Sequence, residues 1–167
     1  MKKMTKNGQL AFLLAVLIMG ILFYSSSQTY EQQSQIGLLS KLLHNEPLKD
    51  SLRSISFMYG GSEVSIDSEG YFSFIEFFIR KFAHFSTYFV LSGSFFFSLF
   101  QRKNALWLSV FFGWMAATGY AGMDEFHQML TSGRSPLFQD VMLDSAGALT
   151  AGILCWFVIG LRHKRWV

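Results

Sequence analysis

Four apolar stretches, each close to the length of a membrane-spanning helix, constrain this chain more than any other feature. They cover about residues 9–26, 82–100, 105–122 and 141–161. A helix needs ~20 predominantly apolar residues to cross ~30 Å of hydrocarbon. Charged residues make up only 15% of the 167 residues, against about 25% in soluble domains. The pattern predicts an all-α integral membrane bundle of four transmembrane helices, with residues 1–167 as a single domain.

The first apolar stretch has two interpretations. It follows Lys2, Lys3 and Lys6, as the apolar part of a secretory signal peptide would. However, the Ser-Ser-Ser-Gln sequence at residues 25–28 is a poor cleavage site, and three further stretches follow it. We therefore interpret the first stretch as an uncleaved transmembrane helix.

Basic and acidic residues fall in different segments. Residues 1–9, 101–104 and 162–167 hold eight of the 14 Lys and Arg residues and none of the 11 Asp and Glu residues. Because basic segments favour the cytoplasmic side, both termini are predicted to be cytoplasmic and residues 27–81 extracytoplasmic. The net charge of +3 is therefore a topology signal, and we predict no nucleic-acid partner.

The predicted outer segment, residues 27–81, has elements of its own. Apolar residues between Ile36 and Leu43 share one helical face, which ends near Pro47 and is typical of a short helix on a membrane surface. The residues around Gly60-Gly61 permit a short hairpin. Residues 71–81 are apolar and aromatic, so we expect them to continue into the second span as one helix.

The first of three polar clusters lies at the start of the second span. Lys81, His84 and Tyr88 are three and four residues apart, so they share one helical face. A lysine at a membrane boundary is often only an anchor. A histidine one turn deeper needs a polar partner, which makes His84 either a functional residue or a satisfied packing residue.

The second cluster ends the third span. Asp124 shares a helical face with His127 and Gln128, whereas Glu125 points about 100° away from Asp124. These residues are either the solvated tip of a helix or part of a site. Two acids and a histidine beside an apolar stretch are unusual for a simple tip.

The third cluster begins with Gly133 and Arg134 and enters the last span with Asp140 and Asp144. The two aspartates lie four apart on one face, where like charges repel. We therefore expect a positive partner for them: Arg134, Lys81, a metal ion or a proton. Small residues after Asp144 permit close helix contact, either within the bundle or with another subunit.

Ionisable residues inside a membrane are functional candidates, because burying them unpaired is expensive. The alternative is a network of ion pairs that staples three helices together. The single cysteine, Cys155, excludes a multi-cysteine metal site, and we predict no cofactor. The candidate binding residues are Lys81, His84, Tyr88, Asp124, Glu125, His127, Gln128, Arg134, Asp140 and Asp144.

These motifs, in this order, resemble the VanZ-like family of small bacterial membrane proteins. The family pattern is Lys-x-x-His with a Tyr one turn on, then Asp-Glu-x-x-Gln, then Gly-Arg, then Asp with Asn and Gly on the last helix. Ser26-Ser27-Gln28 is also similar to the family. Thr87 and Asp144 depart from it, standing where many members carry Glu and Asn. The matching residues are Lys81, His84, Tyr88, Asp124, Glu125, Gln128, Gly133, Arg134, Asp140, Asp144 and Gly147.

The resemblance implies a multi-pass protein of the bacterial plasma membrane. The family's founding member is linked to resistance against teicoplanin, a glycopeptide that binds cell-wall precursors outside the membrane. Our leading hypothesis is an outer-leaflet pocket for a lipid-linked peptidoglycan intermediate or a lipoglycopeptide. In it, Lys81 and Arg134 would meet phosphate or carboxylate groups, and His84, Asp124 and Glu125 would order the pocket.

Two other classes of function stay open. The chain could be an intramembrane hydrolase that uses zinc or a His–Asp acid–base pair, although it has neither His-Glu-x-x-His nor Gly-x-Ser-x-Gly. It could also be a structural partner in an envelope complex, in which case the polar clusters only hold helices together.

Overall fold

The computed structural model describes residues 5–132 and 136–164, and helices dominate it. Three long helices are long and apolar enough to cross a membrane: α1 (Lys6–Ser26), α6 (Tyr71–Lys103) and the Phe138–Leu161 part of α8 (Phe138–Lys164). The fourth long helix, α7 (Leu106–Ser132), is the third predicted span. It is not among these candidate spans. The all-α membrane fold is therefore confirmed with three candidate spans.

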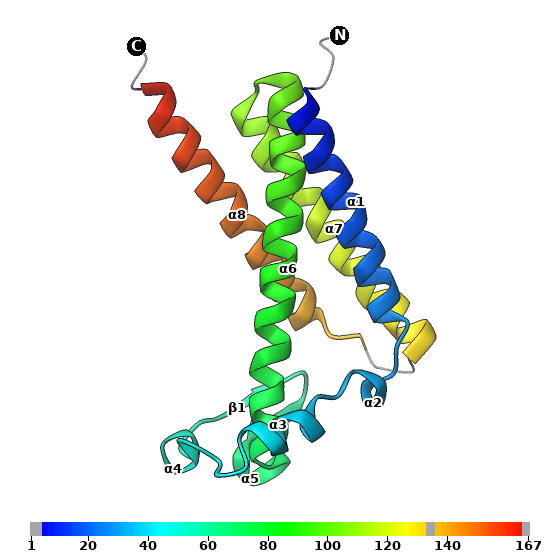
Figure 1. The fold of residues 1–167 in the computed structure, drawn as a ribbon, viewed down its shortest axis with the longest axis vertical. Helices are drawn as coiled ribbons and strands as arrows, with labels where there is room; N and C mark the ends of the chain where they lie inside the picture. The colour runs from blue at the N-terminus through cyan, green and yellow to red at the C-terminus, as the bar shows by residue number, and fades with distance from the viewer. Residues whose placement is uncertain (1–4, 133–135, 165–167) are drawn as a thin grey trace.

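The long helices pack around α6, which contacts α1, α7 and α8 (Figure 1). The start of α1, the turn between α6 and α7, and the end of α8 lie at one end of the bundle. Asn104 makes that turn, with a left-handed φ of 51° and its N–H bonded to the Phe100 carbonyl. An asparagine tolerates this conformation better than most residues do.

The crossing of α6 and α8 depends on a glycine. A Cβ atom added at Gly147 would lie 2.4 Å from the Phe85 carbonyl oxygen. The two backbones therefore approach closely, as small residues permit in membrane helices. This approach brings the start of α8 against the polar face of α6.

The segment between α1 and α6 folds at the other end of the bundle (Figure 1). It contains α2 (Tyr30–Gln33), α3 (Ile36–Leu42), α4 (Lys49–Leu52), the strands β1 (Ser56–Tyr59) and β2 (Ser62–Ser65), and α5 (Ile66–Glu69). The expected short helix before Pro47 is α3, and the expected hairpin is β1–β2. Residues 71–81 continue into α6, as predicted.

The hairpin is antiparallel, with Phe57 opposite Val64 and Tyr59 opposite Ser62. Gly60 and Gly61 make its turn with φ of 58° and 88°, a conformation that favours glycine. Val64 and Ile66 pack with Tyr71 and Phe74 in a small apolar core on the first turns of α6. This packing fixes the hairpin against α6 and positions Tyr59 beside the polar clusters.

Candidate functional site

The polar residues begin one helical turn from the apolar core of the bundle. Leu22, Tyr88, Ala121 and Ala148 are buried together in that core, one from each long helix. Three or four residues further toward the α2–α5 end, the same helices place Ser26, His84, Asp124 and Asp144. We call these four residues the polar layer. Residues three or four apart lie one above the other on a helix, which explains why the layer has a member on every helix.

One ion pair and one amide contact hold the carboxylates of the polar layer. His84 Nδ1 lies 3.4 Å from Asp144 Oδ2, and Gln128 Nε2 donates to Asp124 Oδ2 at 3.2 Å. Asp144 is only 2% exposed. Within the described residues, the other oxygen of each aspartate and the buried hydroxyl of Tyr88 have no hydrogen-bond partner. These buried oxygens can therefore still form hydrogen bonds, and a buried polar group without one is energetically costly.

Asp140 lies one turn beyond the polar layer and has two partners. Lys81 Nζ is 2.5 Å from Asp140 Oδ1, and the Tyr59 hydroxyl donates to the same oxygen. The Lys81 ammonium also lies over the rings of Tyr59 (4.6 Å) and Phe77 (5.2 Å). Lys81, one of the expected positive partners, thus pairs with Asp140. Asp144 instead contacts His84, which was not among the expected partners.

Glu125, Gln128 and His127 take different directions from α7. Glu125 accepts a hydrogen bond from the Leu137 N–H at 3.0 Å, which ties the start of α8 to α7. His127 faces α1: its Nδ1 is 2.7 Å from Ser26 Oγ, and its ring stacks on Phe23 with centroids 4.3 Å apart. His127 therefore joins α7 to α1 and does not line the pocket described next. Gly133 and Arg134 lie outside the described residues.

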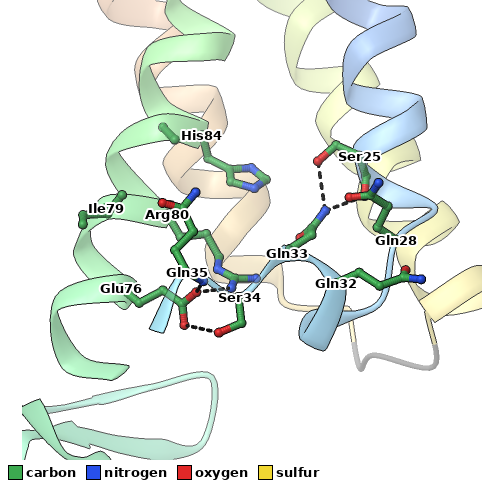
Figure 2. A pocket seen from close by; sticks show the side chains of 11 residues that line it. Ser25, Gln28, Gln32, Gln33, Ser34, Gln35, Glu76, Ile79, Arg80 and His84 are labelled. Carbon is green, nitrogen blue, oxygen red and sulfur yellow. Dashed lines mark hydrogen bonds and ion pairs between the residues drawn. The ribbon is translucent and has the colours of Figure 1, made fainter. Parts of the chain in front are cut away.

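A pocket of about 460 Å³ opens between the α1–α3 segment and α6 (Figure 2). We call it the amide pocket because four glutamines line it. One wall consists of Ser25, Gln28, Gln32, Gln33, Ser34 and Gln35. The other wall, on α6, consists of Glu76, Ile79, Arg80, Ala83 and His84. Its volume falls within the ~300–1,000 Å³ of small-molecule sites.

Glu76 fixes the shape of the amide pocket. Its side chain is 4% exposed, and it accepts from the Gln35 N–H (2.6 Å), the Tyr30 hydroxyl (3.0 Å) and Ser34 Oγ (3.4 Å). Arg80 Nη2 lies 3.4 Å from the same carboxylate, and its guanidinium lies 4.6 Å from the Tyr30 ring centroid. One buried carboxylate thus anchors the α2–α3 segment to α6.

A second pocket of about 290 Å³ lies on the hairpin side of α6. It shares Glu76 and Arg80 with the amide pocket. The residues that line only the second pocket include Lys81, Glu125, Gln128 and Asp140. Of the candidate residues from sequence, His84 lines the amide pocket and these four line its neighbour. Four other candidates line neither pocket: Tyr88, Asp124, His127 and Asp144.

The two hydrogen-bonding anchors of the site, Glu76 and Tyr59, were not predicted, and neither was Arg80. A carboxylate and a guanidinium four residues apart inside an aromatic stretch were the available signal for Glu76 and Arg80. Gln28 ends the Ser-Ser-Gln stretch that resembles the VanZ-like family, and Ser25 precedes that stretch, yet their place in a pocket follows only from the fold.

The described residues contain no group of three or more His, Cys, Asp and Glu side chains that could hold a metal ion. The arrangement instead offers hydrogen-bonding amides and hydroxyls, one guanidinium, and one imidazole whose Nδ1 is paired with a carboxylate. These groups suit binding of a polar ligand, and they suit proton transfer at His84.

One comparison with known protein families gives a match. The profile of the VanZ/LLP1 family matches residues 11–160, which includes all of α6 and α7, most of α1 and α8, and the described walls of both pockets. Searches of curated proteins and of solved structures found no match. The extent of the profile match shows that the chain belongs to the VanZ/LLP1 family.

Proposed function

We propose that this protein is a multi-pass envelope protein whose amide pocket engages an amphiphile at the outer face of the plasma membrane. The candidate ligands are a lipid-linked cell-wall intermediate and a glycopeptide antibiotic that carries a lipid chain. Binding would contribute to tolerance of teicoplanin-type antibiotics. In this proposal α7 is the fourth span, both termini are cytoplasmic, and the α2–α5 segment faces outward.

The charge distribution supports this topology. The basic residues Lys6, Arg102 and Lys103 belong to the end of the bundle that holds the α6–α7 turn, whereas Asp124, Asp140 and Asp144 belong to the opposite end. Positive residues favour the cytoplasmic side. The amide pocket then opens where the helices meet the outer headgroups, at a depth that an amphiphile occupies.

One observation carries the proposal: Arg80 and His84 lie one helical turn apart and line the same pocket. Figure 2 shows both side chains on the α6 wall, across from Gln33 and Ser25. A guanidinium and an imidazole at this spacing offer hydrogen bonds to one polar headgroup, while the apolar remainder of the ligand stays in the bilayer.

The pairing of His84 with Asp144 favours a second candidate function, acid–base hydrolysis of a lipid-linked ester or phosphoester. Asp144 contacts Nδ1 of the ring, which is how a carboxylate orients a catalytic imidazole. The His84 ring also lines the amide pocket, where a bound ester would lie. Turnover would appear as a mass change in the ligand, whereas binding leaves its mass unchanged.

The test is a teicoplanin susceptibility assay in a deletion strain. The strain is complemented with wild type, His84→Ala, Asp124→Asn or Arg134→Ala, and an epitope tag reports protein abundance. His44→Ala and Asp50→Asn are matched controls, because both residues are exposed and remote from the pockets.

We expect the three site variants to be abundant and to fail to restore tolerance, while both controls restore it. Full complementation by the site variants would overturn the proposal. A parallel loss of abundance and tolerance would show that the polar clusters only staple the helices together.

A further inference from the structure

We infer that the amide pocket recognises the uncharged sugar of a glycosylated amphiphile and selects against a bare phosphate or carboxylate. This inference rests on the proposed function and names the part of the ligand that the pocket contacts. The expectation that Lys81 and Arg134 meet phosphate or carboxylate groups stays a prediction, because Lys81 lines the neighbouring pocket and Arg134 lies outside the described residues.

The charges that line the amide pocket balance. Among the described residues that line it, Arg80 is the one permanently charged cation and Glu76 is the one carboxylate, while the His84 imidazole is paired with Asp144. Arg80 and Glu76 lie 3.4 Å apart, and Glu76 is fixed by three further hydrogen bonds from the α2–α3 segment. An anion placed beside Arg80 would therefore also lie beside a buried negative charge, which opposes its binding.

Lys81, which follows Arg80 on α6, is already engaged. Lys81 is in contact with Asp140 and faces the rings of Tyr59 and Phe77. Its ammonium group belongs to the neighbouring pocket, and it does not line the amide pocket. Phosphate sites usually gather several cationic or backbone N–H donors around one anion, and the amide pocket has one balanced guanidinium.

The remaining polar lining is neutral and can both donate and accept hydrogen bonds. The glutamine side chains each carry an NH₂ donor and a carbonyl acceptor, and serine hydroxyls do both. Gln33 Nε2 donates to the Ser25 carbonyl (2.5 Å) and to Ser25 Oγ (2.9 Å), so this wall is ordered before a ligand arrives. Sugar hydroxyls and amides, which also donate and accept, match such a lining.

The α6 wall supplies an apolar side. Ile79 and Ala83 line the pocket beside His84, and the neighbouring Phe82 is 73% exposed on the same helix. A ligand with its sugar against the amides could therefore lay a lipid chain along this apolar surface of α6. The pocket thus fits a molecule that joins a sugar to a lipid chain, and both candidate ligands have that chemistry.

The experiment measures binding to the purified full-length protein in lipid nanodiscs. The probes are a polyprenyl-diphosphate-linked disaccharide, the same polyprenyl diphosphate without sugar, teicoplanin, and a teicoplanin core that carries the same acyl chain directly in place of the sugars. We expect each glycosylated probe to bind at least about tenfold more tightly than its sugar-free counterpart, because the sugar-free probe makes fewer hydrogen bonds to the pocket. The two pairs distinguish a cell-wall lipid from an antibiotic as the source of the sugar.

Variants of the pocket residues identify the side chains that bind the sugar. Gln28→Ala combined with Gln35→Ala should reduce the preference for the glycosylated probe about tenfold and leave binding of the sugar-free probe unchanged. The matched control is Gln9→Ala, an exposed glutamine at the other end of α1. Glu76→Gln keeps the side-chain shape and removes the negative charge, so it should raise affinity for the polyprenyl diphosphate.

The outcomes separate the inference from the proposed function. Equal binding of glycosylated and sugar-free probes would overturn the sugar inference and leave the proposed function standing. Absence of binding by all four probes to a monodisperse protein would overturn both. A preference that survives the double glutamine substitution would place the sugar elsewhere and would also overturn the inference.

Discussion

The Lys81 ammonium lies 2.5 Å from the Asp140 carboxylate and joins α6 to α8. Tyr59 of the outer hairpin donates to the same carboxylate oxygen. Three segments that are far apart in the sequence therefore meet at one acidic group. Both members of the ion pair are mostly buried, with side chains 17% and 18% exposed, so each charge is compensated by the other more than by water.

Replacing Lys81 by Met should destabilise the protein. The substitution leaves the Asp140 carboxylate without its cation, and an unpaired, mostly buried group of this kind costs about 1–3 kcal/mol. The midpoint of thermal unfolding in detergent reports the loss. Adding Asp140→Asn to Lys81→Met should restore part of the midpoint, while Lys103→Met, at the exposed far end of α6, should change little. A double variant no more stable than the single would contradict the pairing.

A methyl group at Gly147 should disturb the α6–α8 crossing. The added Cβ would lie 2.4 Å from the Phe85 carbonyl oxygen, and overpacking of this kind costs about 1–3 kcal/mol. Gly160 is the matched control, because nothing lies within 4 Å of its added Cβ. Gly160→Ala should leave stability unchanged or raise it by up to ~1 kcal/mol. Equal unfolding midpoints for the two variants would show that the helices do not approach as described.

Tyr59 should make stability fall in alkaline solution. Burial, the hydrogen bond to Asp140 and the charge of that carboxylate raise the pKa of Tyr59 above its ordinary value of 10.0. The folded state therefore keeps the phenol protonated, and its contribution to stability is complete below the unfolded pKa. That contribution is lost as the pH rises from the unfolded pKa toward the folded pKa.

The measurement is the thermal midpoint from about pH 8 to pH 11 for wild type and Tyr59→Phe. The variant should be less stable at the lower pH, because it lacks the hydrogen bond, and its midpoint should fall less steeply with rising pH. Parallel curves would show that Tyr59 titrates alike in the folded and unfolded states.

The predicted topology can be tested with single cysteines. Cys155 is the only cysteine in the chain, so Cys155→Ser provides a background for Asp50→Cys, in the α2–α5 segment, and Lys103→Cys, at the α6–α7 turn. A membrane-impermeant maleimide should label position 50 in intact cells. It should label position 103 only after the membrane is opened. The reverse pattern would invert the protein and place the amide pocket on the cytoplasmic side.

The sequence predicted the helical elements well because their signals are local. Apolar length indicated α1, α6 and α8, and the glycine pair at 60–61 predicted the hairpin turn. The pairing of Lys81 with Asp140 was among the expected alternatives, because two aspartates on one helical face need a positive partner. Such signals depend on helical spacing and do not require knowledge of how the helices pack.

The amide pocket could not be predicted, because it depends on contacts between distant residues. Glu76 binds Tyr30 and Gln35, which precede it by 46 and 41 positions. Nothing in the local pattern around Gln33 or Gln35 indicates that a carboxylate on α6 will hold that segment in place. For His127 the local pattern was misleading. The residue shares a helical face with Asp124, yet its ring packs on α1.

Photocrosslinking in living cells tests most directly whether the amide pocket holds an amphiphile. A photoreactive amino acid is placed at Ile79, on the pocket wall, or at Val90, three turns further along α6 and similarly exposed. After illumination, mass spectrometry identifies what each position has captured. Capture of a glycosylated amphiphile at position 79, with only bulk phospholipid at position 90, is the predicted result. Identical phospholipid adducts at both positions would contradict a ligand-binding pocket.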